Sequence, residues 1–134
     1  MASGTAGTNA REYPQQMIHY LRKSITHLDN GRTVDVGRLP AGAVMLKPIS
    51  GVQVNVAFNG DTTNTLDIGP STDSGTNLWM TVGSLAAVAF VPLDEAVSMI
   101  VASDTLVQAK VVASANASAG QGEIIIAYVP DNDQ

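Results

Sequence analysis

The sequence contains no cysteine and few charged residues. The lack of cysteine excludes disulfides and thiolate-bound metals. Charged residues make up 14% of the chain, well below the roughly 25% of a typical soluble domain. A surface so poor in charge and rich in threonine, serine, asparagine and alanine indicates that much of it contacts protein rather than water. An ordinary β-sandwich with a serine- and threonine-rich exterior remains the alternative.

Aromatic residues are also scarce, at 4% of the sequence, so the core is expected to consist mainly of valine, isoleucine, leucine and alanine. A chain of 134 residues fits one domain and buries roughly two thirds of the surface that its unfolded form exposes. We therefore expect a single hydrophobic core that folds without a metal or a covalent cross-link.

Positive charge is sparse outside the first third of the chain. Residues 1–38 contain five cations and three acids, whereas the other 96 residues contain two cations and nine acids. The net charge of −5 argues against a nucleic-acid binder, because phosphate contacts need clustered lysine and arginine. The asymmetry would suit head-to-tail or arm-to-body contacts between copies, so Arg22, Arg32 and Arg38 are candidate partner-binding residues.

No apolar run approaches the roughly 20 residues that cross a bilayer, and the N-terminus lacks the layout of a signal peptide. These features predict a soluble protein made in the cytoplasm, with no membrane partner. Residues 1–16 are small and polar, and we expect a flexible arm there, followed by one β-sandwich domain over 17–134. An arm that becomes ordered on docking would contact a partner through Arg11, Tyr13 and Pro14; a terminus of no consequence is the alternative.

The clearest strand signal lies between residues 43 and 69. Val52, Val54, Val56 and Phe58 alternate with other residues, which predicts a strand with one buried face. Asn59-Gly60 is expected to turn with positive φ angles, and a second strand is predicted over 65–68.

The segment 17–28 fits helical and alternating patterns alike. Because Asp29-Asn30-Gly31 is a strong turn signal and 33–36 alternates, a strand–turn–strand hairpin is the more economical interpretation. Proline and glycine predict a bend or bulge over 47–51. The apolar run 85–91 is interpreted as a strand buried on both faces, with a short helix as the alternative.

In the C-terminal third, Val97, Met99 and Val101 alternate with other residues. Further strands are predicted over 107–111 and 124–129. The chain thus shows about eight short strands, with turn signals every eight to twelve residues. This pattern is typical of an all-β antiparallel sandwich or barrel.

No catalytic motif or zinc-site spacing is present, so the sequence predicts neither an enzyme nor a cofactor. His19 and His27 have no evident catalytic partner. Asp61, Asp67 and Asp73 recur every six residues, but they lack the spacing of a calcium loop and are better explained as turn residues. Trp79 could stack on a sugar or anchor a protein contact; filling the core is at least as plausible.

The runs DNGRTVDVGRLPAGAVML (29–46) and GVQVNVAFNGDTTNTLDIG (51–69) together resemble small virion proteins of tailed bacteriophages, found among the head-decoration or cement proteins of short-tailed phages. The resemblance covers roughly residues 18–90. It implies a jelly-roll-like β-sandwich on the outside of an icosahedral capsid that bridges major capsid protein subunits. It also implies a homo-oligomer, a dimer or trimer, synthesised in the cytoplasm of a bacterial host.

Two other roles remain open at this stage. One is a carbohydrate- or receptor-binding β-sandwich of a virion, with Trp79 and the loop 69–76 exposed together. The other is a head-completion or tail protein, which would assemble into a ring with a wide channel.

Overall fold

The computed structural model describes residues 17–130, which form nine strands and two 3₁₀ turns. In chain order the strands are β1 (His19–Thr26), β2 (Thr33–Leu39), β3 (Val44–Met45), β4 (Gly51–Val56), β5 (Asn64–Pro70), β6 (Met80–Ser84), β7 (Phe90–Pro92), β8 (Thr105–Ala113) and β9 (Gln121–Val129). The turns are η1 (His27–Asp29) and η2 (Lys47–Ile49). In this part of the chain no helix has the length and apolarity that crossing a membrane requires.

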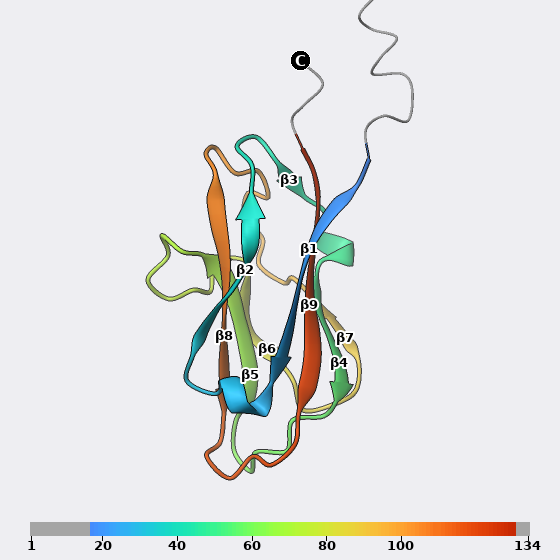
Figure 1. Cartoon of the computed structure of the whole chain (residues 1–134), viewed down its shortest axis with the longest axis vertical. Coiled ribbons are helices and arrows are strands. Elements are labelled where there is room, and N and C mark those ends of the chain that lie inside the picture. The colour runs from blue at the N-terminus through green and yellow to red at the C-terminus, as the bar shows by residue number, and fades with distance from the viewer. Residues whose placement is uncertain (1–16, 131–134) are drawn as a thin grey trace, which may run out of the picture.

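The strands form two antiparallel sheets, which Figure 1 shows packed against each other along the length of the molecule. The five-stranded sheet has the order β1-β9-β4-β7, with β3 also paired to β9. The four-stranded sheet has the order β2-β8-β5-β6. The expected all-β antiparallel sandwich is therefore confirmed.

The N-terminal segment is a strand, but the predicted hairpin is wrong. β1 pairs with β9 in one sheet and β2 pairs with β8 in the other. Between them, η1 begins with a capping box: the Leu28 amide donates to Thr26 Oγ1, and the Thr26 amide donates to Asp29 Oδ2. Gly31 follows at φ +78°, a conformation that glycine adopts without steric cost. The predicted turn is therefore present, but it connects the two sheets.

The alternation in β4 breaks after Val54. Val52 and Val54 are fully buried, whereas Val56 is 43% exposed. The pairing with β9 shifts register between Val54 and Val56, and one extra residue in a strand moves the following side chains to the opposite face. Phe58 returns to the core beyond the strand, where its ring covers Gly120 so closely that a Cβ there would lie 2.6 Å from Phe58 Cγ.

The Asn59-Gly60 turn forms without the positive φ angles that the sequence predicted, since neither residue has a positive φ. Side-chain hydrogen bonds hold it: the Gly60 amide donates to Asn64 Oδ1, and Asn64 Nδ2 donates to the Gly60 carbonyl, both at 2.8 Å. The turn also connects the two sheets rather than closing a hairpin.

Two further strand predictions need correction. In the run 85–91 only Phe90 and Val91 lie in a strand, β7, and the predicted burial on both faces is wrong: only Leu85 is buried, and residues 86–90 are exposed. The run passes along the open side of β4, where the Val54 amide donates to the Ala89 carbonyl, so no second neighbour covers it. The segment 97–101 is a loop that contributes only a single bridge, between Ile100 and Val44.

The remaining strand predictions agree with the structure, and the predicted arm over 1–16 lies outside the described residues. The break over 47–51 is η2, and the last two predicted strands are β8 and β9. The core between the sheets is mainly aliphatic, and its two buried aromatic side chains are Phe58 and Trp79.

Candidate functional site

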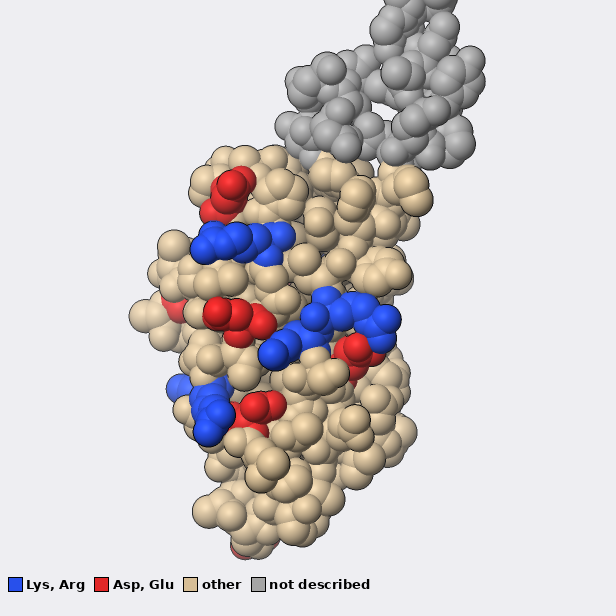
Figure 2. Space-filling view, in the orientation of Figure 1, with Lys and Arg blue, Asp and Glu red and all other residues tan. Residues whose placement is uncertain are grey.

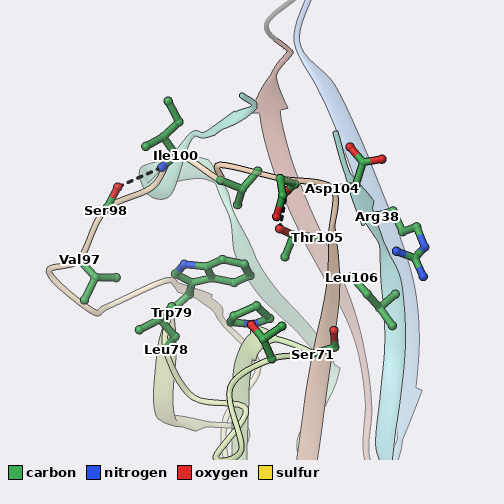
Figure 3. Close-up of a pocket in the computed structure, with 14 residues that line it drawn as sticks. Arg38, Ser71, Leu78, Trp79, Val97, Ser98, Ile100, Asp104, Thr105 and Leu106 are labelled. Carbon is green, nitrogen blue, oxygen red and sulfur yellow. Dashed lines mark hydrogen bonds between the residues drawn. The ribbon is translucent and has the colours of Figure 1, made fainter. Parts of the chain in front are cut away.

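One end of the sandwich contains a pocket of about 420 Å³. Figure 3 shows the Trp79 indole in the middle of this region, with Leu78 beside it and the loop that carries Val97 and Ile100 on one side. Leu106 from β8 and Arg38 from β2 lie on the other side. The pocket therefore joins an apolar wall to a polar rim that includes Arg38.

The first loop of the pocket precedes Trp79 and is held by the Asp73 carboxylate. That carboxylate accepts hydrogen bonds from the amides of Gly75 and Asn77, the latter at 2.8 Å. Trp79 is then fixed by its own amide, which donates to the Ile68 carbonyl at 2.9 Å. Asp73 is thus a turn-forming residue, as the sequence indicated.

The second loop of the pocket is fixed to the segment before β3. The Gly42 amide donates to the Val101 carbonyl, and the Met45 amide donates to the Met99 carbonyl, at 2.7 and 2.8 Å. The Ala41 amide donates to Asp104 Oδ1 at 2.9 Å. These bonds shape the loop with backbone groups, so its exposed apolar side chains are held in place rather than packed into the core.

The pocket wall contains no catalytic grouping. It is lined by hydrophobic side chains, hydroxyl groups, one arginine and one aspartate. Within residues 17–130, no three histidine or acidic side chains are arranged to hold a metal ion. The arrangement offers shape and apolar contact, which suits binding of another molecule.

Arg22 lies on β1 and forms an ion pair with Glu123 of β9. Arg22 Nε and a terminal nitrogen donate to the two Glu123 oxygens at 2.9 and 2.6 Å. The hydrogen bond and the nearby negative charge raise the pKa of the Arg22 guanidinium above its usual value. This candidate residue is therefore engaged within its own sheet.

We predict that this ion pair contributes little to folding, because the Arg22 side chain is solvent-exposed. Water and dissolved ions screen an exposed pair. A double-mutant cycle with Arg22→Ala and Glu123→Ala, measured by urea unfolding, should give a small coupling energy that decreases as the salt concentration rises. A large coupling energy that high salt leaves unchanged would contradict this interpretation.

The other candidate residues are dispersed. Arg32 is exposed between η1 and β2, Arg38 is exposed near the end of β2, and Trp79 is 2% exposed in the core beneath the pocket. Of these, the structure brings only Arg38 and Trp79 together, at the pocket. Arg11, Tyr13 and Pro14 lie outside the described residues.

Sequence reasoning missed the exposed apolar residues. Leu78, Val97 and Ile100 at the pocket, and Val88 and Phe90 before and in β7, are all exposed. For Val88 and Phe90 a signal was present, because the run 85–91 contains small alanines that fill a core poorly, but the run was interpreted as a buried strand.

No protein-family model matches the chain, and no curated protein matches it in sequence. Two solved structures are similar in fold. One is a chain of the capsid asymmetric unit of cyanophage Pam1, at a TM-score of 0.64 and 15% identity over 97% of this chain and 92% of that one. The other is a chain of the acid-stable capsid of Helicobacter pylori bacteriophage KHP30. It has a TM-score of 0.67 and 17% sequence identity, and the match covers 84% of this chain and 87% of that one. The fold of this protein is thus one that occurs in chains of phage capsid structures.

Proposed function

We propose that this protein is a capsid cement or decoration protein, which binds the outside of an icosahedral phage head and bridges neighbouring major capsid protein subunits. The observation that carries the proposal is the fold likeness to chains from two phage capsids, which extends over almost the whole chain. On this proposal the protein is not an enzyme. It is made in the host cytoplasm and acts by repeated weak contacts whose effects add over many copies.

The strand order supports the proposal. Apart from β3, each sheet contains four strands, and the chain crosses to the other sheet after each of these strands except β5, which is followed by β6 in the same sheet. Eight strands in two antiparallel sheets make up a jelly roll, which occurs in viral capsid domains and in lectins. The jelly-roll-like fold is thus compatible with a virion role and also with sugar binding.

The burial of Trp79 favours the capsid role over sugar binding. The carbohydrate-binding alternative required Trp79 to be exposed beside the loop 69–76, so that its ring could stack on a sugar. The indole is instead 2% exposed, so almost none of its ring surface is free to stack on a sugar. A head-completion or tail protein would use the same fold, and assembly into a ring with a wide channel would support that role instead.

The test is binding to phage heads. Purified protein is mixed with empty heads of the source phage that lack it, and the heads are recovered by sedimentation. We expect saturable binding to the head exterior, visible by electron microscopy, and a higher temperature of head disruption. Heads that neither bind the protein nor gain stability would refute the proposal.

The N-terminal segment provides a second prediction. We expect removal of residues 1–13 to abolish or strongly weaken head binding while changing the melting temperature of the isolated protein by no more than a few degrees. The reason is that the paired strands begin only at His19. Head sedimentation and thermal unfolding measure the two effects separately, and a loss of many degrees would contradict the expectation.

A further inference from the structure

Folding divides the charges of residues 17–130 between two halves of the sandwich. One half contains β1 and β9 of one sheet and β2 and β8 of the other, with their adjoining loops. This basic half has five cations and four acids. Its cations are Arg22, Lys23, Arg32, Arg38 and Lys110. Figure 2 shows the face that carries β1 and β2, where cations and acids are interspersed.

The acidic half contains β3 to β7 and has one cation, Lys47, and five acids. Its acids are Asp61, Asp67, Asp73, Asp94 and Glu95. The division differs from the one visible in the sequence, because the C-terminal strands β8 and β9 join the N-terminal strands. The outermost strands of the basic half are β1 and β2, and those of the acidic half are β6 and β7. These two pairs form opposite edges of the sandwich, called here the β1–β2 edge and the β6–β7 edge.

Several of these charges have no partner among the described residues. The side chains of Lys23, Arg32 and Arg38 form no hydrogen bond or ion pair with any of residues 17–130, and the same holds for the Glu95 carboxylate. Lys47 Nζ donates to the Glu95 backbone carbonyl at 2.8 Å rather than to its carboxylate. Unpaired charges of opposite sign thus lie in opposite halves.

Exposed apolar side chains occur at the same two edges. Met17, Ile18 and Tyr20 are each more than half exposed where β1 begins. At the opposite edge, Val82 of β6 is 62% exposed and Val88 before β7 is 64% exposed. Each edge therefore combines exposed apolar side chains with a preferred sign of charge.

The backbone at both edges offers a further pairing surface. Among the strands of residues 17–130, β1 and β2 each pair with one other strand, and so do β6 and β7. The outer backbone groups of an edge strand are a template for pairing with another chain. β7 is short and contains Pro92, which limits backbone pairing, so side-chain contacts are expected to predominate there.

We infer that copies of this protein bind one another head to tail, with the β1–β2 edge of one copy against the β6–β7 edge of the next. A second copy is the occupant that the charges favour, since cations outnumber acids over β1, η1 and β2, whereas acids outnumber cations over β3 to β7. A symmetric contact of the acidic edge with itself would place like charges together. This inference rests on the proposed function, which requires many neighbouring copies.

A head-to-tail contact has a consequence for symmetry. Contacts between different surfaces close into rings or continue as filaments, whereas a two-fold dimer uses the same surface on both copies. The inference therefore selects a trimer or larger ring over a dimer.

The experiment uses two charge-reversed variants of the full chain. One carries Lys23→Glu and Arg32→Glu at the β1–β2 edge, and the other carries Asp94→Lys and Glu95→Lys at the β6–β7 edge. Sedimentation velocity over a range of protein concentrations gives the assembly state, and circular dichroism establishes that each variant is folded. Asp61→Lys is the control, because it makes the same kind of charge change in the loop between β4 and β5.

We expect the wild-type protein to form a ring and each variant alone to dissociate at least tenfold more readily. A chain that combines both reversals should form the ring again, because each contact then joins an acidic β1–β2 edge to a basic β6–β7 edge. The control should assemble like the wild-type protein. High salt should weaken assembly of the wild-type protein, since it screens exposed charges.

Three results would overturn the inference: a wild-type monomer at all concentrations, assembly that neither reversal weakens, or no recovery of assembly when both reversals are combined in one chain. Head binding is measured separately. A wild-type monomer that still binds heads would refute the contact between copies and would still support the proposed function. A ring that depends on both edges but does not bind heads would support the contact between copies and refute the proposed function.

Discussion

Replacing Trp79 with alanine should lower the free energy of unfolding by about 3–5 kcal/mol, the usual cost of truncating a large buried aromatic side chain. The indole is 2% exposed, and its backbone fixes two segments: its amide donates to the Ile68 carbonyl, and its carbonyl accepts from the Glu95 amide. Removing the ring would open the core toward the pocket. For a chain of this size the melting temperature should fall by roughly 10–20 °C.

The measurement is thermal and urea unfolding followed by circular dichroism, because the variant lacks the only tryptophan. Trp79→Phe should retain much of the lost stability. Leu78→Ala is the matched control. The Leu78 side chain neighbours Trp79 but is exposed, so its truncation should lower the free energy of unfolding by less than about 1 kcal/mol. If Trp79→Ala cost no more than Leu78→Ala, the indole would not be part of the core, and the sugar-binding alternative would regain support.

Replacing Gly51 with alanine is the second large effect that we expect. Gly51 opens β4 and pairs with Pro92 on one side and Ile125 on the other. A Cβ there would collide with the Val91 carbonyl oxygen and would lie 2.7 Å from Pro92 Cα. Because these are backbone atoms, β7 has to move away from β4. Overpacking of this kind costs about 1–3 kcal/mol or more, and we expect the upper end.

Gly122→Ala is the control for this substitution. Gly122 lies in β9 next to β4, but a Cβ there would meet its nearest atom, the Gln53 carbonyl oxygen, at 3.1 Å. A shift of a few tenths of an ångström would accommodate it, so the loss should be clearly smaller. Comparable unfolding energies for the two variants would show that β7 is not held against β4 as described. Hydrogen exchange of the β4 amides, including that of Val54, would report the separation directly.

Local patterns in the sequence predicted most strands and their class. β8 and β9 follow the predicted alternation because both lie inside their sheets and have a neighbour on each side. Turn chemistry was equally informative at Asp29-Asn30-Gly31, where capping by Thr26 and Asp29 and the positive φ of Gly31 depend only on nearby residues.

The errors share a physical cause. The run 85–91 is as apolar as a buried strand, but burial depends on what lies beside a segment, and this one follows an open edge. The exposure of Val56 likewise depends on a register shift against β9, a strand about 65 residues away in the sequence. No local pattern contains that information.

The sequence by itself therefore determined the class of this protein: a cysteine-free, weakly charged chain of short alternating strands, with an aliphatic core and a resemblance to phage virion proteins. Tertiary structure alone decided the surfaces. It buried Trp79, exposed the apolar residues before β7, paired Arg22 with Glu123 and left a small excess of cations in one half and of acids in the other. Composition and periodicity are local properties, whereas a surface arises only when strands distant in the sequence become neighbours.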